Sequence, residues 1–375
     1  MRRRVSGVVA VKPLRDRTGI DRRRLLACAA AIPTLGLLRP AFAQDTKVIR
    51  LGSGPTGATE VLFGGLVANA ISNPPGSREC DRGGNCGVPG LIAVAQTTGG
   101  AVENLRAVAR GDIELGLSQA DVASWLYDGS GLYAGQEPLS NLRTVGRLYP
   151  ATIHLVVRDT AKINGITDLR GKRVGIGTDG SAQAATARML LSAYNVHWKQ
   201  VQLKPLAFTA MTEALAGGTI DALFVVSAAP VLALEDLARR TPIRIVPIAG
   251  PIADKIADVL PYYSVGIVPA GTYGAPNDVR TLEVGIVLVA RATMDDALGF
   301  SMARAIWHER NVGLFHTGHP SGKLMVKEAA GRGFTIPLHQ GAARYYLGQG
   351  IPVPAENLLA PVTPARANSP NSRSS

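Results

Sequence analysis

The sequence predicts an α/β fold built as two lobes, and two observations carry this prediction. Short apolar runs alternate with segments of helical apolar periodicity along most of the chain, an order typical of mainly parallel sheets flanked by helices. In addition, one local pattern, an apolar run, a glycine turn and a helix, occurs at residues 48–71 and again at residues 173–194. Each turn leaves unpaired N–H groups at a helix start, where the helix dipole favours an anion. Two such helix starts predict two lobes that face each other across a cleft.

Residues 1–43 are predicted to be a signal peptide and not part of the fold. An arginine run followed by two leucines, residues 22–26, precedes an apolar run at residues 27–38, and a small-residue cleavage site ends at Ala43. The arginines before the leucine pair resemble a twin-arginine signal, and an ordinary Sec signal is the alternative. Cleavage near Ala43 would release the mature chain into the periplasm. The apolar run is too short, and is interrupted by Pro33, for a membrane-spanning helix.

The length and net charge of the chain limit the classes of function that it could have. A chain of 375 residues with 46% hydrophobic content can bury a large core and would normally divide into two domains. The formal net charge is +12, but residues 1–43 hold ten Lys or Arg and two Asp or Glu, so only +4 remains on the mature chain. No basic run with interleaved aromatic residues remains there, so we expect no nucleic acid partner.

The two cysteines after the signal, Cys80 and Cys86, lie in a turn-rich insertion at residues 74–87. An even cysteine count in an exported chain predicts a disulfide between them. Zinc is the weaker alternative, because no second Cys or His pair lies nearby at ligand spacing. We therefore expect no metal, and we expect the bridge to stiffen the insertion more than it stabilises the fold.

The first lobe begins with three strand and helix pairs. The strands are expected at residues 48–51, 91–96 and 113–117, and the helices at residues 58–71, 102–110 and 122–127. In sheets of this kind, ligands bind beyond the carboxyl ends of the strands. Those ends are rich in Thr, Ser, Gln and Gly, and although any one of these residues could simply cap a helix, three similar ends favour a polar site.

The second lobe follows a long strand pair at residues 142–158 that is suited to crossing between lobes. Strands are expected near residues 201–206, 220–226 and 243–248, with helices at residues 183–194, 212–217 and 231–240. Residues 261–269 read as the return crossover, and a strand at residues 282–289 and helices near residues 294–309 and 323–330 follow. We place lobe 1 at residues 44–149 plus 264–362, lobe 2 at residues 150–263, and a disordered tail at residues 363–375.

Both glycine turns match the pattern G-x-G-x-x-G, at residues 52–57 and 175–180, which raises a dinucleotide-binding alternative. That fingerprint also needs an acidic residue at the end of the second strand, and neither residues 96–98 nor residues 207–208 contain one. An exported nucleotide-dependent oxidoreductase is therefore the alternative function. The histidines lack metal-ligand spacing, and there is no nucleophile elbow or P-loop, so we predict that the chain is not an enzyme and has no cofactor.

Several segments together resemble the TAXI-type solute receptors of TRAP transporters. The matching segments are residues 52–59, 97–105, 117–123, 148–150, 168–174, 269–273 and 337–346, and the resemblance covers about residues 47–350. It implies a periplasmic binding protein of type II-like fold that closes on a small organic anion, of the acidic amino acid or dicarboxylate class. It also implies delivery of that ligand to a sodium-coupled membrane permease.

The resemblance and the strand ends together predict the ligand contacts. Donors are expected from the first glycine turn, from two neighbouring strand ends, from the helix start of the second lobe and from tyrosines at the crossovers, which could instead pack the hinge. These residues are Thr56, Gly57, Thr59, Thr98, Gln119, Ser181, Gln183, Tyr149 and Tyr263. One departure from the family is Glu60, which puts an acid near the expected anion site. If Glu60 faces the cleft, a ligand with an amino group, or an uncharged one, fits better than a simple dicarboxylate.

Overall fold

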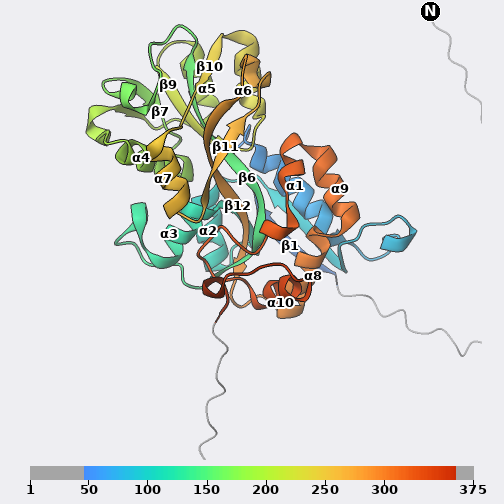
Figure 1. The fold of residues 1–375 in the computed structure, drawn as a ribbon. Coiled ribbons are helices and arrows are strands. Elements are labelled where there is room, and N and C mark those ends of the chain that lie inside the picture. The colour runs from blue at the N-terminus through green and yellow to red at the C-terminus, as the bar shows by residue number, and fades with distance from the viewer. Residues whose placement is uncertain (1–45, 360–375) are drawn as a thin grey trace, which may run out of the picture. The chain divides into compact units, whose positions relative to one another are not determined.

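The computed structural model describes residues 46–359, and a mixed sheet of ten strands runs through them (Figure 1). The predicted signal at residues 1–43 and the predicted tail at residues 363–375 lie outside the described residues. The α/β fold predicted from the sequence is confirmed, because helices flank a central sheet whose two ends form two lobes.

In the first lobe, β1 (Lys47–Gly52) pairs in parallel with both β4 (Leu91–Gln96) and β5 (Leu115–Gln119). The helices α1 (Thr59–Ile71), α2 (Ala101–Arg110) and α3 (Ala120–Asp128) follow these three strands. The short pair β2 (Ser72–Asn73) and β3 (Val88–Pro89) brackets the cysteine insertion. Helix α2 ends as its sequence predicts, because Gly111 takes the left-handed conformation with φ of 86° that glycine adopts without strain.

In the second lobe, β7 (Arg173–Gly175) pairs in parallel with both β8 (Gln202–Lys204) and β9 (Ala222–Ser227). The helices of this lobe are α4 (Ala182–Ala193), α5 (Phe208–Ala216) and α6 (Leu232–Arg240), and β10 (Ile243–Val246) lies at its edge. Side chains of α5, α6 and β9 form a separate apolar cluster that includes Met211, Leu223 and Leu234. Each lobe therefore packs helices against its own part of the sheet.

Two long strands, β6 (Leu142–Arg158) and β12 (Val279–Arg291), join the two lobes into one sheet (Figure 1). They pair with each other in antiparallel orientation. Strand β12 also pairs with β5, and β6 also pairs with β9 and β10. The return strand β11 (Tyr263–Val268) lies against β12. The long strand pair expected at residues 142–158 is thus one continuous strand that carries the sheet from one lobe to the other.

The rest of the chain covers the sheet with α7 (Pro251–Val259), α8 (Asp296–Ile306), α9 (Glu309–Gly318) and α10 (Gln340–Gly348). The helix expected at residues 323–330 is wrong, since two short 3-10 turns, Pro320–Leu324 and Lys327–Ala329, occupy that stretch. Helix α7 was not expected, and only Ala253 and Ile256 of its residues are buried. None of the helices within residues 46–359 combines the length and apolar character needed to span a bilayer.

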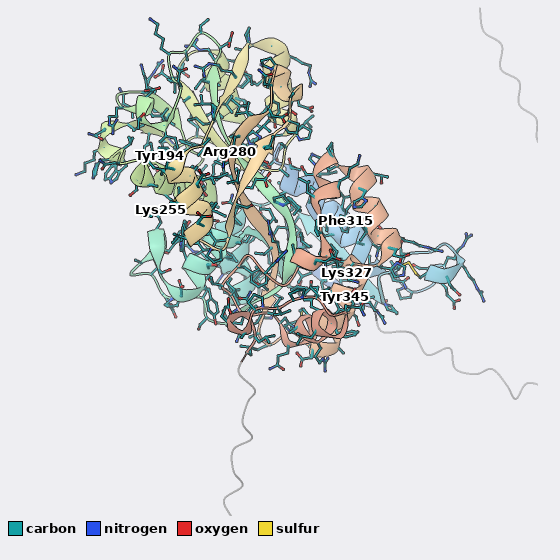
Figure 2. The ribbon with its side chains drawn as sticks, viewed as in Figure 1. Tyr194, Lys255, Arg280, Phe315, Lys327 and Tyr345 are labelled. Atoms are coloured by element: carbon teal, nitrogen blue, oxygen red, sulfur yellow. A yellow bond between two sulfur atoms is a disulfide. The ribbon has the colours of Figure 1, made fainter. Side chains whose placement is uncertain are left out.

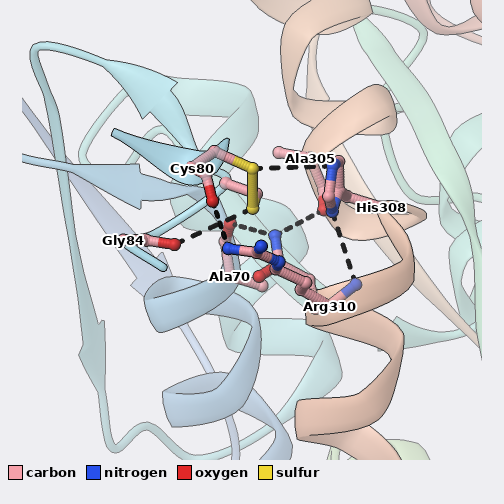
Figure 3. Close-up of a disulfide and its surroundings, with 8 residues drawn as sticks. Ala70, Cys80, Gly84, Ala305, His308 and Arg310 are labelled. Atoms are coloured by element: carbon pink, nitrogen blue, oxygen red, sulfur yellow. Dashed lines mark hydrogen bonds between the residues drawn. A yellow bond between two sulfur atoms is a disulfide. The ribbon is translucent and has the colours of Figure 1, made fainter. Parts of the chain in front are cut away.

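The predicted disulfide between Cys80 and Cys86 is present in the insertion (Figure 3). The insertion is held against the start of α9, where the Arg310 guanidinium donates to the carbonyl of Cys80 and a ring nitrogen of His308 lies 3.6 Å from the Cys80 sulfur. Asn311 on the same helix donates to the carbonyl of Ala70 at the end of α1, at 2.9 Å. The insertion is therefore anchored to a helix far away in the sequence.

Candidate functional site

A cavity of about 220 Å³ lies between the two lobes, at the carboxyl ends of strands from both. From the first lobe it is lined by the residues just after β1 and around the end of β5, and from the second by those after β7 and β8. Leu117, Phe208, Val226 and Ile286 supply apolar surface, and Ser53, Ser118 and Thr178 supply hydroxyl-bearing positions. The cavity thus lies at the strand ends, where ligands bind in sheets of this kind.

Two helices begin at this cavity, α2 from the first lobe and α4 from the second. Gly99, Gly100 and Ala101 line the cavity at the start of α2, and Ser181 and Ala182 line it at the start of α4. Ser181 is the N-cap of α4, where its Oγ accepts from the N–H of Ala184 at 3.2 Å. The positive ends of two helix dipoles thus meet at one small cavity, an arrangement that favours a negative group on a bound molecule.

The start of α1 differs from these two helix starts, because it makes hydrogen bonds to the second lobe. The Thr59 N–H donates to Oγ of Ser227 at 3.0 Å, and the Thr59 hydroxyl donates to the carbonyl of Ala228 at 2.8 Å. Ser227 is the last residue of β9 in the second lobe. These buried contacts fix the two lobes against each other beside the cavity.

Glu60 lines the cavity next to this contact. Its Oε2 accepts a hydrogen bond from the Ser227 hydroxyl at 2.8 Å, and its Oε1 is buried with no partner among the residues described. Burial raises the pKa of the Glu60 carboxyl to about 7, and the Ser227 hydrogen bond partly opposes that shift. Gly54 makes room for this side chain, since a Cβ at position 54 would lie 2.8 Å from the Glu60 Cβ.

Glu60 is the one charged residue among those that line the cavity. Basic side chains such as Lys255 on α7 and Arg280 on β12 are exposed instead (Figure 2), and the Arg280 guanidinium pairs with Asp254 at 2.6 Å. A bound molecule would consequently meet helix starts, amides, hydroxyls and one carboxyl group, and no lysine or arginine.

Of the residues predicted to contact a ligand, Gln119, Ser181 and Gln183 line the cavity. The Gln119 amide oxygen accepts from the Thr186 hydroxyl of α4 at 3.2 Å, so this side chain also bridges the lobes. The Gln183 amide nitrogen lies 3.6 Å from the Met211 sulfur. Their role in ligand binding stays a prediction.

The other four polar or turn residues, Thr56, Gly57, Thr59 and Thr98, are not among the lining residues. Thr56 is exposed, and Gly57 has a φ of 90° in the turn. Thr98 accepts a hydrogen bond from the N–H of Gly100 at 3.2 Å, which orders the turn before α2. Thr98 thus has a local contact and Thr59 has contacts with the second lobe, while the neighbouring residues Glu60 and Gly99 line the cavity.

The two predicted tyrosines also lie outside the lining and are fully buried. Tyr149 stacks on Phe63 with ring centroids 3.7 Å apart, and its hydroxyl has no partner within the described part of the chain. Burial, and next the charge of Glu60, raise the pKa of Tyr149 well above its ordinary value. The Tyr263 hydroxyl donates to Oδ2 of Asp121 at 2.6 Å.

Sequence reasoning did not single out Phe208, Leu117 or Ile286, which supply apolar lining. Phe208 follows the end of a strand in the same way as the polar candidates, so the strand-end rule would have found it had apolar residues been included. Ile286 carries no such signal, because it lies within β12 and reaches the cavity only through the pairing of β12 with β5. Its position depends on contacts between residues far apart in the sequence.

The glycines of the two G-x-G-x-x-G turns have packing roles in this structure. A Cβ at Gly52 would lie 2.3 Å from Oδ1 of the buried Asn104, whose amide donates to the carbonyls of Gly52 and Ser53. A Cβ at Gly175 would lie 3.1 Å from the side chain of Met211. Close packing therefore accounts for these glycines without a nucleotide.

One group of potential metal ligands occurs among residues 46–359, formed by Cys80, Cys86 and His308, whose ligand atoms lie within 4.8 Å of one another. The two sulfur atoms are bonded to each other, so neither is a thiolate that could coordinate an ion. None of the three lines the cavity between the lobes.

Comparison with solved structures finds similar chains among solute-binding proteins. The periplasmic aliphatic sulphonate binding protein SsuA from Escherichia coli is 14% identical, with a TM-score of 0.45, over 84% of this chain and 96% of that one. The ligand binding component of an ABC-type import system from Staphylococcus aureus, with zinc bound, is 11% identical, with a TM-score of 0.46, over 84% and 97% of the two chains.

Comparison with family models identifies the family of this chain, because the model of the NMT1-like family matches residues 51–350. The chain belongs to the NMT1-like family.

Proposed function

We propose that this chain is the solute receptor of a TRAP-type transporter, and that it captures a small organic acid between its lobes for delivery to a membrane permease. The observation that carries the proposal is the cavity between the lobes with the starts of α2 and α4 at its wall. The resemblance of residues 47–350 to TAXI-type receptors supports the TRAP class, and cleavage near Ala43 would place the receptor in the periplasm.

The size of the cavity favours a small ligand. Its volume of about 220 Å³ lies below the roughly 300–1,000 Å³ typical of sites for drug-sized molecules. A carboxylate on the ligand would be attracted by the positive dipole ends of the two helices. The Ser181 hydroxyl and the amide nitrogens of Gln119 and Gln183 would then donate from both lobes, so that closure completes the binding site.

The two lobes are proposed to move about β6 and β12, with lobe 1 at residues 44–149 plus 264–362 and lobe 2 at residues 150–263. Hinge closure around a ligand is common in two-lobed binding proteins. Such a movement would make and break two sets of hydrogen bonds between the lobes. These are the bonds of Thr59 with Ser227 and Ala228, and the bond of Gln119 with Thr186. We propose that these contacts form when the lobes close on a ligand.

Two measurements test the proposal. Native mass spectrometry of freshly purified mature protein should show a retained small acid, and a thermal-shift screen of amino acids, 2-oxo acids and dicarboxylates should raise the melting temperature for that class. A nucleotide mass would contradict the proposal. Uptake of the ligand in vesicles that contain a TRAP permease and this receptor should depend on a sodium gradient, whereas dependence on ATP would exclude the TRAP class.

A further inference from the structure

The cavity contains an acceptor that the protein leaves unsatisfied. Oε1 of Glu60 is buried without a partner in the described part of the chain, while Oε2 receives the Ser227 hydroxyl. A buried carboxylate oxygen without a donor costs free energy, and a charged donor offsets that cost most effectively. Oε1 of Glu60 is therefore placed to accept a hydrogen bond from a bound molecule.

A second unpartnered acceptor lies in the same region. The hydroxyl oxygen of Tyr149, on β6, is also buried without a partner among residues 46–359, and the charge of Glu60 is one of the causes that raise the pKa of this tyrosine. An ammonium group has three donors and no acceptor, so it is complementary to the Glu60 carboxylate. A carboxylate offers only acceptors and would face Glu60 as a like charge.

We propose that Glu60 binds a cationic nitrogen of the solute, so that the ligand is an amino acid or a similar zwitterion and not a simple dicarboxylate. This inference rests on the proposed function, since it assigns the ligand class at the same cavity. The carboxylate of the ligand would lie at the starts of α2 and α4 and its ammonium at Glu60. No lysine or arginine lines the cavity to bind the second carboxylate of a dicarboxylate.

Matched ligand pairs test the inference directly. L-glutamate with glutarate, L-aspartate with succinate and L-leucine with 4-methylpentanoate differ only in the amino group, and isothermal titration calorimetry at pH 8 measures each. We expect the amino member of at least one pair to bind at least tenfold more tightly than its partner. Glu60→Gln should weaken that binding by roughly 10- to 100-fold, as expected when a hydrogen bond to a charged group is lost.

Two control variants make the result specific. Glu137→Gln removes an exposed carboxylate that does not line the cavity, and it should leave the affinity within about twofold. Tyr149→Phe removes a buried hydroxyl outside the cavity lining, so it should change the affinity for the amino ligand less than Glu60→Gln does. Circular dichroism of each variant confirms that it folds.

The outcomes separate this inference from the proposed function. Tight binding of glutarate or succinate, with no preference for the amino member, would overturn the role of Glu60 and leave the organic-acid receptor standing. Equal affinity of the wild type and Glu60→Gln would do the same, because it would show that the negative charge of Glu60 does not contribute to binding. Failure of every pair to bind would contradict the proposed ligand class itself, and with it this inference.

Discussion

The hydroxyl of Tyr263, the first residue of β11, donates a 2.6 Å hydrogen bond to Asp121 near the start of α3. The same carboxylate oxygen receives the Thr186 hydroxyl of α4 at 3.2 Å, and the other accepts the Val122 N–H at 2.7 Å. Burial raises the pKa of Asp121, and these hydrogen bonds oppose that shift. One buried carboxylate therefore connects the return strand, the first lobe and the second lobe.

Tyr263→Phe is expected to lower the free energy of unfolding by roughly 1–3 kcal/mol, because it leaves a buried carboxylate with one donor fewer. The measurement is urea denaturation at pH 7. Tyr262→Phe is a suitable comparison, since that neighbouring hydroxyl accepts from the Trp125 indole at 3.0 Å and does not contact Asp121. Unchanged stability in Tyr263→Phe would show that the hydrogen bond to Asp121 contributes nothing.

The ligand-free protein should lose stability as the pH rises from about 4.5 to about 7. Folding raises the pKa of Glu60 from 4.5 to about 7, so the native state keeps a proton that the unfolded state releases, and its relative stability falls across this interval. The contribution is at most about 3 kcal/mol. Glu60→Gln should consequently melt higher than the wild type at pH 8, and the difference should vanish near pH 4. A variant less stable than the wild type at pH 8 would contradict this account.

Affinity for an amino ligand should show the opposite trend and strengthen as the pH rises through 7. Only the ionised form of Glu60 attracts an ammonium group, so affinity should fall about tenfold for each pH unit below the pKa of Glu60. Tyr149, the titratable group that responds to Glu60, stays neutral in this range because its own pKa is raised. Titration calorimetry between pH 5 and pH 8 measures the trend, and the profile of Glu60→Gln should be flat. Tighter binding at low pH would mean that a protonated Glu60 donates to the ligand.

Gln119→Ala and Ser181→Ala should both weaken ligand binding, but their effects on stability should differ. Ser181 caps α4, so its loss should also cost about 1 kcal/mol of stability. Gln119 only accepts one inter-lobe hydrogen bond, and Thr186 can still donate to Asp121. Thermal melting and calorimetry of the two variants separate the effects. Full affinity in Gln119→Ala would exclude this residue from the site.

Replacement of both cysteines by serine should loosen the insertion and leave the cavity intact. A bridge between positions six residues apart closes a short loop, and its contribution in the chain-entropy model is about 2 kcal/mol. Hydrogen exchange should accelerate at residues 74–89, while ligand affinity stays unchanged because Cys80 and Cys86 do not line the cavity. Loss of binding in the folded double variant would place the insertion at the cavity rim.

Local signals account for the parts of the fold that could be predicted from the sequence. Strand β4 has the predicted bounds, residues 91–96, and α2 ends at Gly111, because an apolar run and a glycine stop depend only on nearby residues. Local signals could not predict that both lobes share one sheet. It depends on the pairing of β6 with β12, whose residues are more than a hundred positions apart.

The sequence indicated which strand ends lie at the cavity, but not which side chain at each strand end lines it. Thr98 was chosen, but it orders its own turn while Gly99 and Gly100 line the cavity. Similarly, Thr59 faces the second lobe while Glu60 lines the cavity, because consecutive residues of a helix point about 100° apart. Which neighbour faces a cleft depends on the exact start of the helix, which sequence patterns define only to within a residue or two.

The close approach of Gly54 to Glu60 limits how this site can diverge among related receptors. Because a Cβ at position 54 would lie 2.8 Å from the Cβ at position 60, any residue other than glycine at position 60 requires glycine at position 54 while the backbone keeps this path. A relative could exchange the acid at position 60 for another side chain without cost at position 54. A relative with any other residue at position 54 needs a different backbone path through this turn. Ligand preference can therefore drift through position 60 alone, and an alignment should show position 54 invariant where position 60 varies.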